Sequence, residues 1–242
     1  MKVDFIIIGA QRCGTTSLWN YLKEHPGISV PNKKELHYFD NRFDKDVSWY
    51  LKYFNNLEGI TGEASPYYLM HPHCPRRIYE FDKSIKFIVL LRDPVDRAYS
   101  HYYHEVDMGK ETRSFEEAIE KEQFSLRGEY NKMLKDLSYN SFYLNHSSYT
   151  ERGKYAIQLK RWFGYFPKDQ FLILKSESFF LSIKETMNKV FRFLGLDEFE
   201  IDNSKAFNNL DYCSMSDTVR NQLREFFKSY NTDLYNMIGM KF

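Results

Sequence analysis

Short β-branched runs alternate along the chain with longer stretches in which apolar residues recur every three or four positions. The first run, residues 3–8, ends at Gly9, and an amphipathic stretch that includes Leu18 and Leu22 begins near Thr15. Continuous apolar runs are typical of buried strands, whereas a spacing of three to four is typical of helices. The amino-terminal segment therefore predicts a strand, a glycine-containing loop and a helix.

The same order returns in the middle of the chain. Residues 86–91 form a second apolar run, which is followed by Asp93 and Pro94. Aspartate is a favoured N-cap and proline a favoured first helical residue, so a helix is expected to begin at Pro94. Ser114 and Glu117 have the spacing of a capping box, which predicts the start of another helix.

The rest of the chain divides into one irregular stretch and several regular ones. Residues 121–150 are polar and aromatic without clean periodicity, which predicts irregular or mobile structure. Beyond them the patterns predict a helix, a buried strand and two more helices, at residues 155–163, 170–175, 183–194 and 219–230. Gly195 is the expected C-cap of the first of these last two helices.

Strands that alternate with helices indicate an α/β fold. The expected architecture is a doubly wound, mainly parallel sheet with helices on both faces, and its first strand, loop and helix resemble a P-loop. The sequence contains no internal repeat and no linker rich in Pro, Gly or Ser. Residues 1–242 are therefore predicted to form a single domain.

Composition narrows the class of protein. The 242 residues include 34 Lys and Arg against 33 Asp and Glu, a net charge of +1, which argues against a nucleic-acid partner. With 43% hydrophobic and 28% charged residues the chain is globular rather than disordered. Aromatic residues make up 18%, which is compatible with a packed core, an acceptor cleft or a base-stacking site.

The number of cysteines and the length of the apolar runs indicate the cellular compartment of the protein. Cys13, Cys74 and Cys213 are widely spaced and odd in number, which favours reduced intracellular thiols, although one disulfide remains open. No apolar stretch approaches the roughly 18 residues of a membrane span. The sequence predicts a soluble, cytoplasmic protein without a membrane span; whether a native membrane anchor has been removed is left open.

The loop after the first strand carries the first candidate chemistry. Residues 9–16, GAQRCGTT, match the pattern GxxxxGK[ST] except that Thr15 stands where the lysine is expected. The amides of residues 12–17 are expected to point at an anion on the helix N-terminus. Because the missing lysine normally bridges the β and γ phosphates, a kinase or NTPase is disfavoured. A tight turn without a ligand is the plain alternative.

Three ordered segments resemble one family. GAQRCGTTSLWNYLKEHP, from residue 9, resembles the 5′-phosphosulfate-binding segment of sulfotransferases that use 3′-phosphoadenosine 5′-phosphosulfate (PAPS), especially the branch that includes heparan sulfate sulfotransferases and bacterial relatives. LLRDPVDRAYSHYYH, at 90–104, resembles the family's 3′-phosphate segment, and ERGKYAIQLKRWF, at 151–163, resembles a later cofactor-binding segment. With GEASPYY at 62–68 and the closing helix, the likeness spans nearly the whole chain.

The resemblance implies a set of cofactor-binding residues, and no metal is expected to be required, because a sulfuryl group carries less charge than a phosphoryl group. The cofactor-binding residues are Arg12, Cys13, Gly14, Thr15, Thr16 and Ser17 for the 5′-phosphosulfate, Arg92 and Ser100 for the 3′-phosphate, and Arg152, Gly153 and Lys154 in a basic loop closing over that phosphate. The residues alone support part of this set. Arg92 leaves the carboxyl end of a strand, where ligands of open α/β sheets bind, and its guanidinium suits a phosphate.

The resemblance also implies catalytic residues. KKELHYFD, at 33–40, resembles the segment that supplies the base in the glycan branch, so Glu35 is the expected base and His37 a positioning group or the alternative base. In an extended segment both side chains would point to one face. Arg12 is expected to stabilise charge on the leaving oxygen, but an arginine hardly titrates and is a poor general acid.

Two departures and one weak motif limit the prediction. Arg12 replaces the loop lysine common in these enzymes, and Ala64 replaces the lysine that glycan sulfotransferases tend to carry before a small residue and proline, so the acceptor need not be a heparan-like chain. His71, His73 and Cys74 are dense enough to suggest a metal, but no second cluster accompanies them, and no metal site is predicted.

The sequence predicts a PAPS-dependent sulfotransferase that moves a sulfuryl group to a hydroxyl or amine of an acceptor. A degenerate P-loop kinase of a small metabolite, requiring ATP and magnesium, and a nucleotide-binding protein without turnover are the alternatives. The identity of the acceptor (glycan, small alcohol, phenol or lipid), O- versus N-sulfation, and the oligomeric state are left open.

Overall fold

The structure is a computed structural model that describes residues 2–202 and 213–242. Its contacts group the chain into two compact units. We call residues 1–91 and 162–209 the sheet unit, and residues 92–161 and 210–242 the helical unit. This grouping does not decide how many domains the chain has, and the single domain over 1–242 stays a prediction.

The sheet unit is built on parallel strands in the order β2-β3-β1-β4-β5. Their bounds are Phe5–Gly9 for β1, Ile28–Ser29 for β2, Ile60–Ala64 for β3, Lys86–Leu91 for β4 and Phe171–Lys175 for β5. The register pairs Phe5 with Gly62 on one side and with Lys86 on the other. Because β1 and β4 are buried along nearly their whole length, they read as continuous apolar runs in the sequence.

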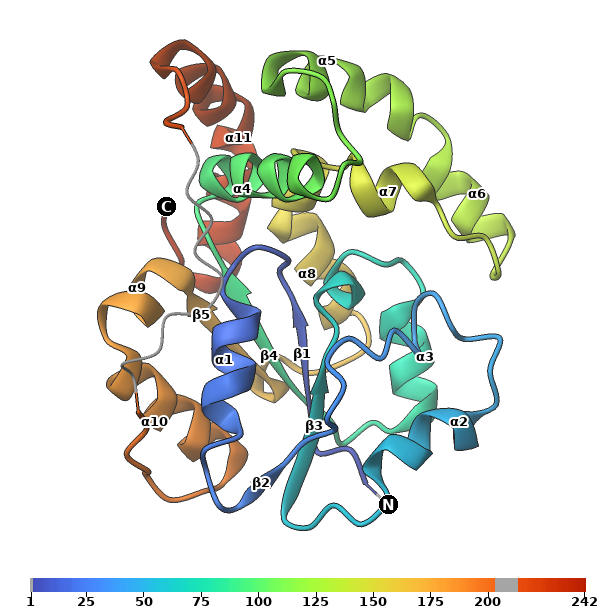
Figure 1. Cartoon of the computed structure of the whole chain (residues 1–242), viewed down its shortest axis with the longest axis vertical. Coiled ribbons are helices and arrows are strands. Elements are labelled where there is room, and N and C mark those ends of the chain that lie inside the picture. Colours follow the sequence, from blue (N-terminus) through green and yellow to red (C-terminus); the bar gives the residue numbers. More distant parts are fainter. Residues whose placement is uncertain (1, 203–212) are drawn as a thin grey trace. The chain divides into compact units, whose positions relative to one another are not determined.

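Helices cover both faces of this sheet, as Figure 1 shows. On one side lie α1 (Thr15–Leu22), α9 (Ser176–Leu181) and α10 (Ile183–Leu194); on the other lie α2 (Val47–Leu51) and α3 (Cys74–Phe81). Short 3₁₀ turns complete the unit at Lys52–Phe54, Pro66–Leu69 and Lys168–Gln170. The predicted α/β, doubly wound architecture is confirmed.

The helical unit contains α4 (Pro94–Asp107), α5 (Phe115–Leu126), α6 (Glu129–Lys135), α7 (Phe142–His146) and α11 (Asp217–Ile238), with the 3₁₀ turn Glu151–Gly153. The helix α8 (Tyr155–Phe163) begins in it. An aromatic core joins α4, α5 and α11, with Tyr99, Tyr102, Phe115, Tyr149, Val219, Leu223 and Phe227 among its buried residues. Many of the chain's aromatic residues thus serve packing.

The predicted helix starts and ends are confirmed where a cap is written in the sequence. The Asp93 carboxylate accepts from the amide of Val95 at 2.8 Å and caps α4, whose first residue is Pro94. Ser114 and Glu117 form the reciprocal capping box of α5. Gly195 ends α10 with φ +84°, a conformation that glycine adopts without steric cost.

The prediction of irregular structure over 121–150 is wrong, because α5 continues to Leu126 and α6 and α7 follow it. A tertiary contact organises these short helices: the buried carboxylate of Glu129 accepts from Ser141 Oγ at 2.5 Å and from the Tyr139 hydroxyl at 2.8 Å. Periodicity is weak because several apolar side chains of this stretch face solvent, namely Phe124, Leu134, Leu137, Phe142 and Tyr143.

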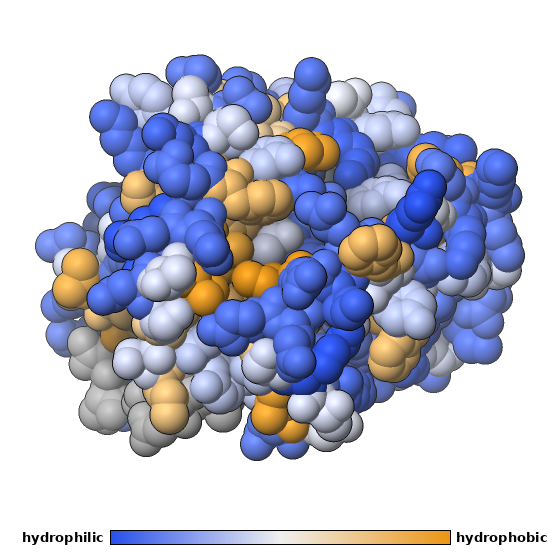
Figure 2. Space-filling model, turned by 90° about the horizontal axis from the view of Figure 1, so that it is seen from above, coloured by the Kyte–Doolittle hydropathy of each residue, from blue (hydrophilic) through white to orange (hydrophobic). Residues whose placement is uncertain are grey.

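Three further observations concern the surface, the helices and the cysteines. The face drawn in Figure 2 is largely hydrophilic, with several apolar side chains gathered near its middle and others scattered between the charged ones. Within the described ranges, none of the helices has the length and apolar character needed to cross a bilayer. Cys13, Cys74 and Cys213 are all free thiols, the first two buried and the third exposed.

Candidate active site

The phosphate loop lies at the carboxyl edge of the sheet, between β1 and α1. The amide of Ala10 donates to the carbonyl of Leu90 in β4 at 2.7 Å, and Ser176 Oγ donates to the carbonyl of Cys13 at 2.9 Å. Gly14 has φ +93°, and a Cβ on it would come within 2.9 Å of the Phe180 ring. The loop is therefore held from two sides, and only glycine fits at position 14.

The loop offers an anion one basic side chain and the amino end of a helix. The side chains of Cys13, Thr15 and Ser17 are buried, whereas those of Arg12 and Thr16 are partly exposed. The first amides of an α-helix have no acceptor within the helix and carry the positive end of its dipole. These features fit a 5′-phosphosulfate bound by main-chain amides and Arg12, without the lysine of a nucleotide triphosphatase.

The predicted base segment is fixed to the neighbouring strand. The amide of Glu35 donates to the carbonyl of Ala64, the last residue of β3, at 2.9 Å, and the amide of His37 donates to Ser65 Oγ at 3.2 Å. Because β3 pairs with β1 in parallel, the base segment and the phosphate loop lie at the same edge of the sheet. Ligands of open α/β sheets bind at this edge.

Glu35 and His37 do lie together, but not on extended backbone. Their φ angles are +62° and +55°, in the left-handed region of backbone conformation that residues other than glycine rarely adopt. The prediction of one shared face was right in its result: the Nε2 atom of His37 is 3.4 Å from Oε2 of Glu35.

A third residue, which the sequence analysis missed, completes this group. The Nδ1 atom of His37 lies 2.7 Å from Oδ2 of Asp40, whose side chain is fully buried, and the Lys34 ammonium is 2.6 Å from Oε1 of Glu35. The only available signal for Asp40 was its position three residues after His37. The result is a row of alternating charges: Lys34, Glu35, His37 and Asp40.

The charges determine which group can accept a proton. Burial disfavours the His37 cation, but hydrogen bonds to Asp40 and Glu35 outweigh it and raise the pKa of His37 to about 10. Burial likewise disfavours the Glu35 carboxylate, yet His37 and Lys34 lower the pKa of Glu35 to about 2. At neutral pH His37 is an imidazolium with no free lone pair. Of the two base candidates, Glu35 is the one in its basic form.

The 3′-phosphate candidates belong to the helical unit. Half-buried Arg92 directly follows the last residue of β4, and its carbonyl accepts from the Tyr155 hydroxyl at 2.9 Å. Ser100 lies on α4 and is 2% exposed. Tyr155, at the start of α8, thereby ties the Arg92 backbone to the last of the three predicted cofactor segments.

The guanidinium of Arg152 is hydrogen-bonded to other residues of the helical unit. Its Nε donates to Ser148 Oγ at 2.8 Å, its Nη2 donates to the carbonyls of Leu144 and Asn145 at 2.7 and 2.8 Å, and the residue is 5% exposed. These contacts favour a role in bracing the turn that carries Gly153 over direct contact with a ligand. A Cβ on Gly153 would lie 2.7 Å from the Phe227 ring, so this position too requires glycine.

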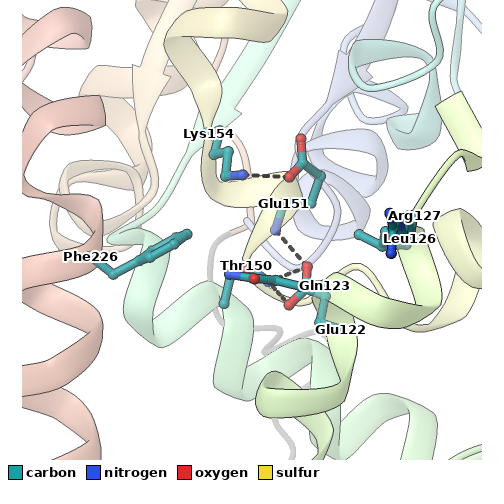
Figure 3. Close-up of a pocket in the computed structure, with 8 residues that line it drawn as sticks. All are labelled: Glu122, Gln123, Leu126, Arg127, Thr150, Glu151, Lys154 and Phe226. Carbon is teal, nitrogen blue, oxygen red and sulfur yellow. Dashed lines mark hydrogen bonds and ion pairs between the residues drawn. The ribbon is translucent and has the colours of Figure 1, made fainter. Parts of the chain in front are cut away.

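Lys154 borders a cavity of about 240 Å³ in the helical unit (Figure 3), lined by Glu122, Gln123, Leu126, Arg127, Thr150, Glu151, Lys154 and Phe226. The Lys154 ammonium is 2.6 Å from Glu151, and the Glu122 carboxylate accepts from the amides of Thr150 and Glu151. Burial raises the pKa of Glu122 to about 7, against the pull of those two amides. Glu122 therefore stabilises the turn that leads to Gly153.

In the cluster His71, His73 and Cys74, whose density suggested a metal, Cys74 has a packing role. Cys74 Sγ donates to the carbonyl of Phe39 at 3.2 Å, and the same carbonyl accepts from Arg77 at 2.7 Å. Over the part of the chain that the structure describes, no group of three or more His, Cys, Asp or Glu residues is arranged to hold a metal ion.

Comparison with known proteins identifies the family. The family model described as "Sulfotransferase domain" matches residues 2–233. This chain belongs to the sulfotransferase family. The crystal structure of a sulfotransferase from Alicyclobacillus acidocaldarius has a TM-score of 0.85 and 30% identity, over 100% of this chain and 98% of that one. The prediction of the fold and of a sulfotransferase-class enzyme is confirmed at the level of the family.

Curated relatives are more distant and longer. The membrane-associated sulfotransferase kil1 of Dictyostelium discoideum is 26% identical over 99% of this chain and 66% of its own length. The mouse heparan sulfate glucosamine 3-O-sulfotransferase 3A1 is 28% identical over 98% of this chain and 63% of its own length. The chain thus spans slightly less than two thirds of these proteins. The residue roles and the cytoplasmic location stay predictions.

Proposed function

We propose that this sulfotransferase-family chain transfers a sulfuryl group from PAPS to a hydroxyl or amine of an acceptor, with Glu35 as the base. The observation that carries the proposal is the row Lys34–Glu35–His37–Asp40, anchored at the carboxyl end of β3 at the same sheet edge as the phosphate loop. A carboxylate held ionised beside a phosphate-binding loop is what in-line transfer to a hydroxyl requires.

The donor is bound by the residues that the sequence singled out. PAPS supplies an activated sulfuryl group and leaves as the 3′,5′-bisphosphate. The amides of residues 12–17 and the Arg12 guanidinium hold its 5′ end and stabilise charge on the leaving oxygen. Arg92 and Ser100 hold the 3′-phosphate, with the backbone of Gly153 and Lys154 alongside, while Arg152 supports that turn from within. Because a sulfuryl group carries less charge than a phosphoryl group, no metal is required.

The acceptor proton goes to Glu35. A base whose pKa is about 2 is weak toward a resting hydroxyl, so the proton moves late, once bond formation to sulfur has made the acceptor oxygen acidic. His37, as an imidazolium fixed by Asp40, keeps the Glu35 carboxylate oriented and charged. An acceptor that reaches Glu35 competes with Lys34 for its Oε1 atom.

A hydroxyl of a carbohydrate or of a small alcohol is the proposed acceptor class. Near the base segment the surface carries Phe43, which is 40% exposed, and Trp49, with Arg42 5.5 Å from its ring centroid. Aromatic faces suit sugar rings, and an arginine suits an anionic substituent. Ala64, in the place of a lysine, removes one cation that a polyanionic glycan would contact, which favours a less charged acceptor.

Calorimetry and a transfer assay test the proposal. Wild type is titrated with 3′-phosphoadenosine 5′-phosphate and, separately, with ATP and magnesium, and Arg12→Ala and Arg92→Ala are titrated with the bisphosphate. We expect metal-independent binding of the bisphosphate, weakened at least tenfold in each variant. Binding of ATP with magnesium but not of the bisphosphate would overturn the proposal in favour of a kinase.

The base is tested on a panel of sugar, phenol and lipid-alcohol acceptors, with sulfated product detected by mass spectrometry. Glu35→Gln is expected to lose about 100-fold or more in turnover while it binds the bisphosphate as wild type does. Glu58→Gln, which changes an exposed glutamate of the same unit, is the matched control and should transfer normally. Bisphosphate binding without turnover on any acceptor would favour a nucleotide-binding protein.

A further inference from the structure

A fully buried carboxylate lies directly beneath the base segment. Glu63, in β3, is 0% exposed and accepts hydrogen bonds from Ser65 Oγ at 2.8 Å, from the Tyr68 hydroxyl at 3.0 Å and from the Tyr50 hydroxyl at 3.1 Å. Burial raises its pKa to about 7, against the opposing effect of these three hydroxyls. Burying an acid at such a cost calls for a structural or functional reason.

Two of the three hydroxyls also accept from the backbone of the base segment. Ser65 Oγ accepts from the amide of His37 at 3.2 Å, and the Tyr68 hydroxyl accepts from the amide of Phe39 at 3.3 Å. Together with the bond from Glu35 to Ala64, every second amide from residue 35 to residue 39 is tied to residues 64–68. These ties hold the stretch that carries Glu35 and His37.

The direction of these hydrogen bonds depends on Glu63. A hydroxyl has one proton, and when it donates that proton to the carboxylate its lone pairs are left to face an amide N–H. Above about pH 7, where Glu63 is mostly ionised, its carboxylate only accepts, so it sets both Ser65 and Tyr68 in the orientation that receives the base segment. A group that can donate, in the same place, would turn at least one of these hydroxyls around.

The base segment needs such support because its backbone is strained. Glu35 and His37 both have positive φ, which costs free energy in residues with a side chain and persists only where the surroundings impose it. Without the ties, the segment can relax toward ordinary backbone angles. Relaxation would separate the His37 imidazole from Asp40 or from Glu35.

We propose that Glu63 is a positioning residue: through Ser65 and Tyr68 it holds the backbone of residues 35–39 so that His37 stays between Glu35 and Asp40. The catalytic part of this inference rests on the proposed function, whereas the structural part does not. Tyr50 provides an internal control, since its hydroxyl donates to the same Glu63 oxygen as Tyr68 but its main tie to the base segment is ring stacking on Tyr38, with centroids 4.8 Å apart, which phenylalanine preserves.

The test compares Glu63→Gln, Ser65→Ala and Tyr68→Phe with Tyr50→Phe. Glutamine keeps the shape of Glu63 but presents a donor on one arm, so it cannot accept from all three hydroxyls. Backbone amide exchange of His37 and Phe39 and the titration of the His37 imidazole are followed by NMR. Above pH 7 we expect Glu63→Gln to exchange at least one of the two amides at least tenfold faster and to lower the His37 titration midpoint. Ser65→Ala should speed exchange of the His37 amide, and Tyr68→Phe should speed exchange of the Phe39 amide.

The remaining outcomes separate this inference from the proposed function. Tyr50→Phe should leave both readouts as in wild type, and bisphosphate affinity within twofold of wild type should show that each variant is folded. With the best acceptor of the panel, Glu63→Gln should lose about 10- to 100-fold in kcat with KM for PAPS unchanged. Unchanged exchange and titration in a folded Glu63→Gln would overturn the inference. If no acceptor is ever sulfated, the proposed function fails while the NMR result still decides the role of Glu63.

Discussion

At the scale of single residues, the active-site candidates are distinguished by their partners rather than by their type. Glu35, Glu63 and Glu122 are the same residue type, yet His37 and Lys34 lower the pKa of the first to about 2, and burial raises the pKa of the other two to about 7. One is a carboxylate at any physiological pH, and the others are close to half-protonated at neutrality. Their chemistry therefore follows from position in the fold.

His37→Asn tests the charge row directly. Loss of the imidazolium removes the hydrogen bond and the positive charge that favour the ionised form of Glu35, so the pKa of Glu35 should rise from about 2 toward its ordinary value of 4.5. The ¹³C shift of the Glu35 carboxyl carbon, followed against pH, measures it. Lys34→Met should act in the same direction, while Lys2→Met, which breaks the 2.7 Å pair with Asp4, should leave Glu35 unaffected. If the titration midpoint of Glu35 stays near 2 in both His37→Asn and Lys34→Met, these two neighbours do not set the pKa of Glu35.

At the scale of elements, the turn before α8 is held by several helices of the helical unit. Glu122 accepts from its amides, Arg152 in the turn donates to the carbonyl of Leu144 in α7, and Gly153 packs against Phe227 and Pro94 without room for a side chain. Four helices of the helical unit, α4, α5, α7 and α11, thus contact this turn, and α4 and α11 pack against its glycine. A substitution there is expected to disturb packing before it disturbs chemistry.

Gly153→Ala is expected to lower the free energy of unfolding by about 1–3 kcal/mol, because its Cβ would lie 2.7 Å from the Phe227 ring and 2.9 Å from Pro94 Cβ. Urea unfolding followed by circular dichroism measures the loss. Phe227→Leu makes room on one side, so the same change in that background should cost less. An equal cost in both backgrounds would mean that the clash with Phe227 is not the cause.

At the scale of the whole molecule, buried acids link stability to pH. Glu122 is 2% exposed, and its pKa of about 7 in the folded chain is above the ordinary 4.5. Between those values the folded state binds more protons than the unfolded state, so this residue's stabilising contribution is complete below about pH 4.5 and is lost as pH rises through 7. Carboxylates with lowered pKa, such as Glu111 beside Arg113, act in the opposite direction and lose their contribution in acid.

Glu122→Gln isolates one of these contributions, because glutamine imitates the protonated acid at every pH. Relative to wild type, the variant should gain stability between pH 4.5 and 7.5, by up to about 3 kcal/mol. Urea unfolding at several pH values gives the difference, and any constant offset from the altered hydrogen bonds does not affect its slope. A difference that is flat with pH would show that Glu122 titrates normally.

Local structure in this chain was largely readable from the sequence. Asp93, Pro94, Ser114 and Gly195 each mark a helix boundary that the structure confirms, because capping depends on residues a few positions apart. The short strand β3 and the helices within 121–150 were not anticipated. β3 buries Thr61 and Glu63, and α6 depends on the bonds of Glu129 to Tyr139 and Ser141, and neither feature appears as an apolar pattern.

By itself, the sequence determined the alternation of strands and helices, the caps, the phosphate loop and membership of the sulfotransferase family, since each of these is written in neighbouring residues or in ordered motifs. Only the tertiary structure decided which groups share protons and which are held in place. Asp40 joined His37 through a left-handed backbone, and Glu63 reached residues 37 and 39 through hydroxyls that lie 28 and 29 positions away in the chain. Burial and the packing of distant segments set those relationships, and no local pattern encodes them.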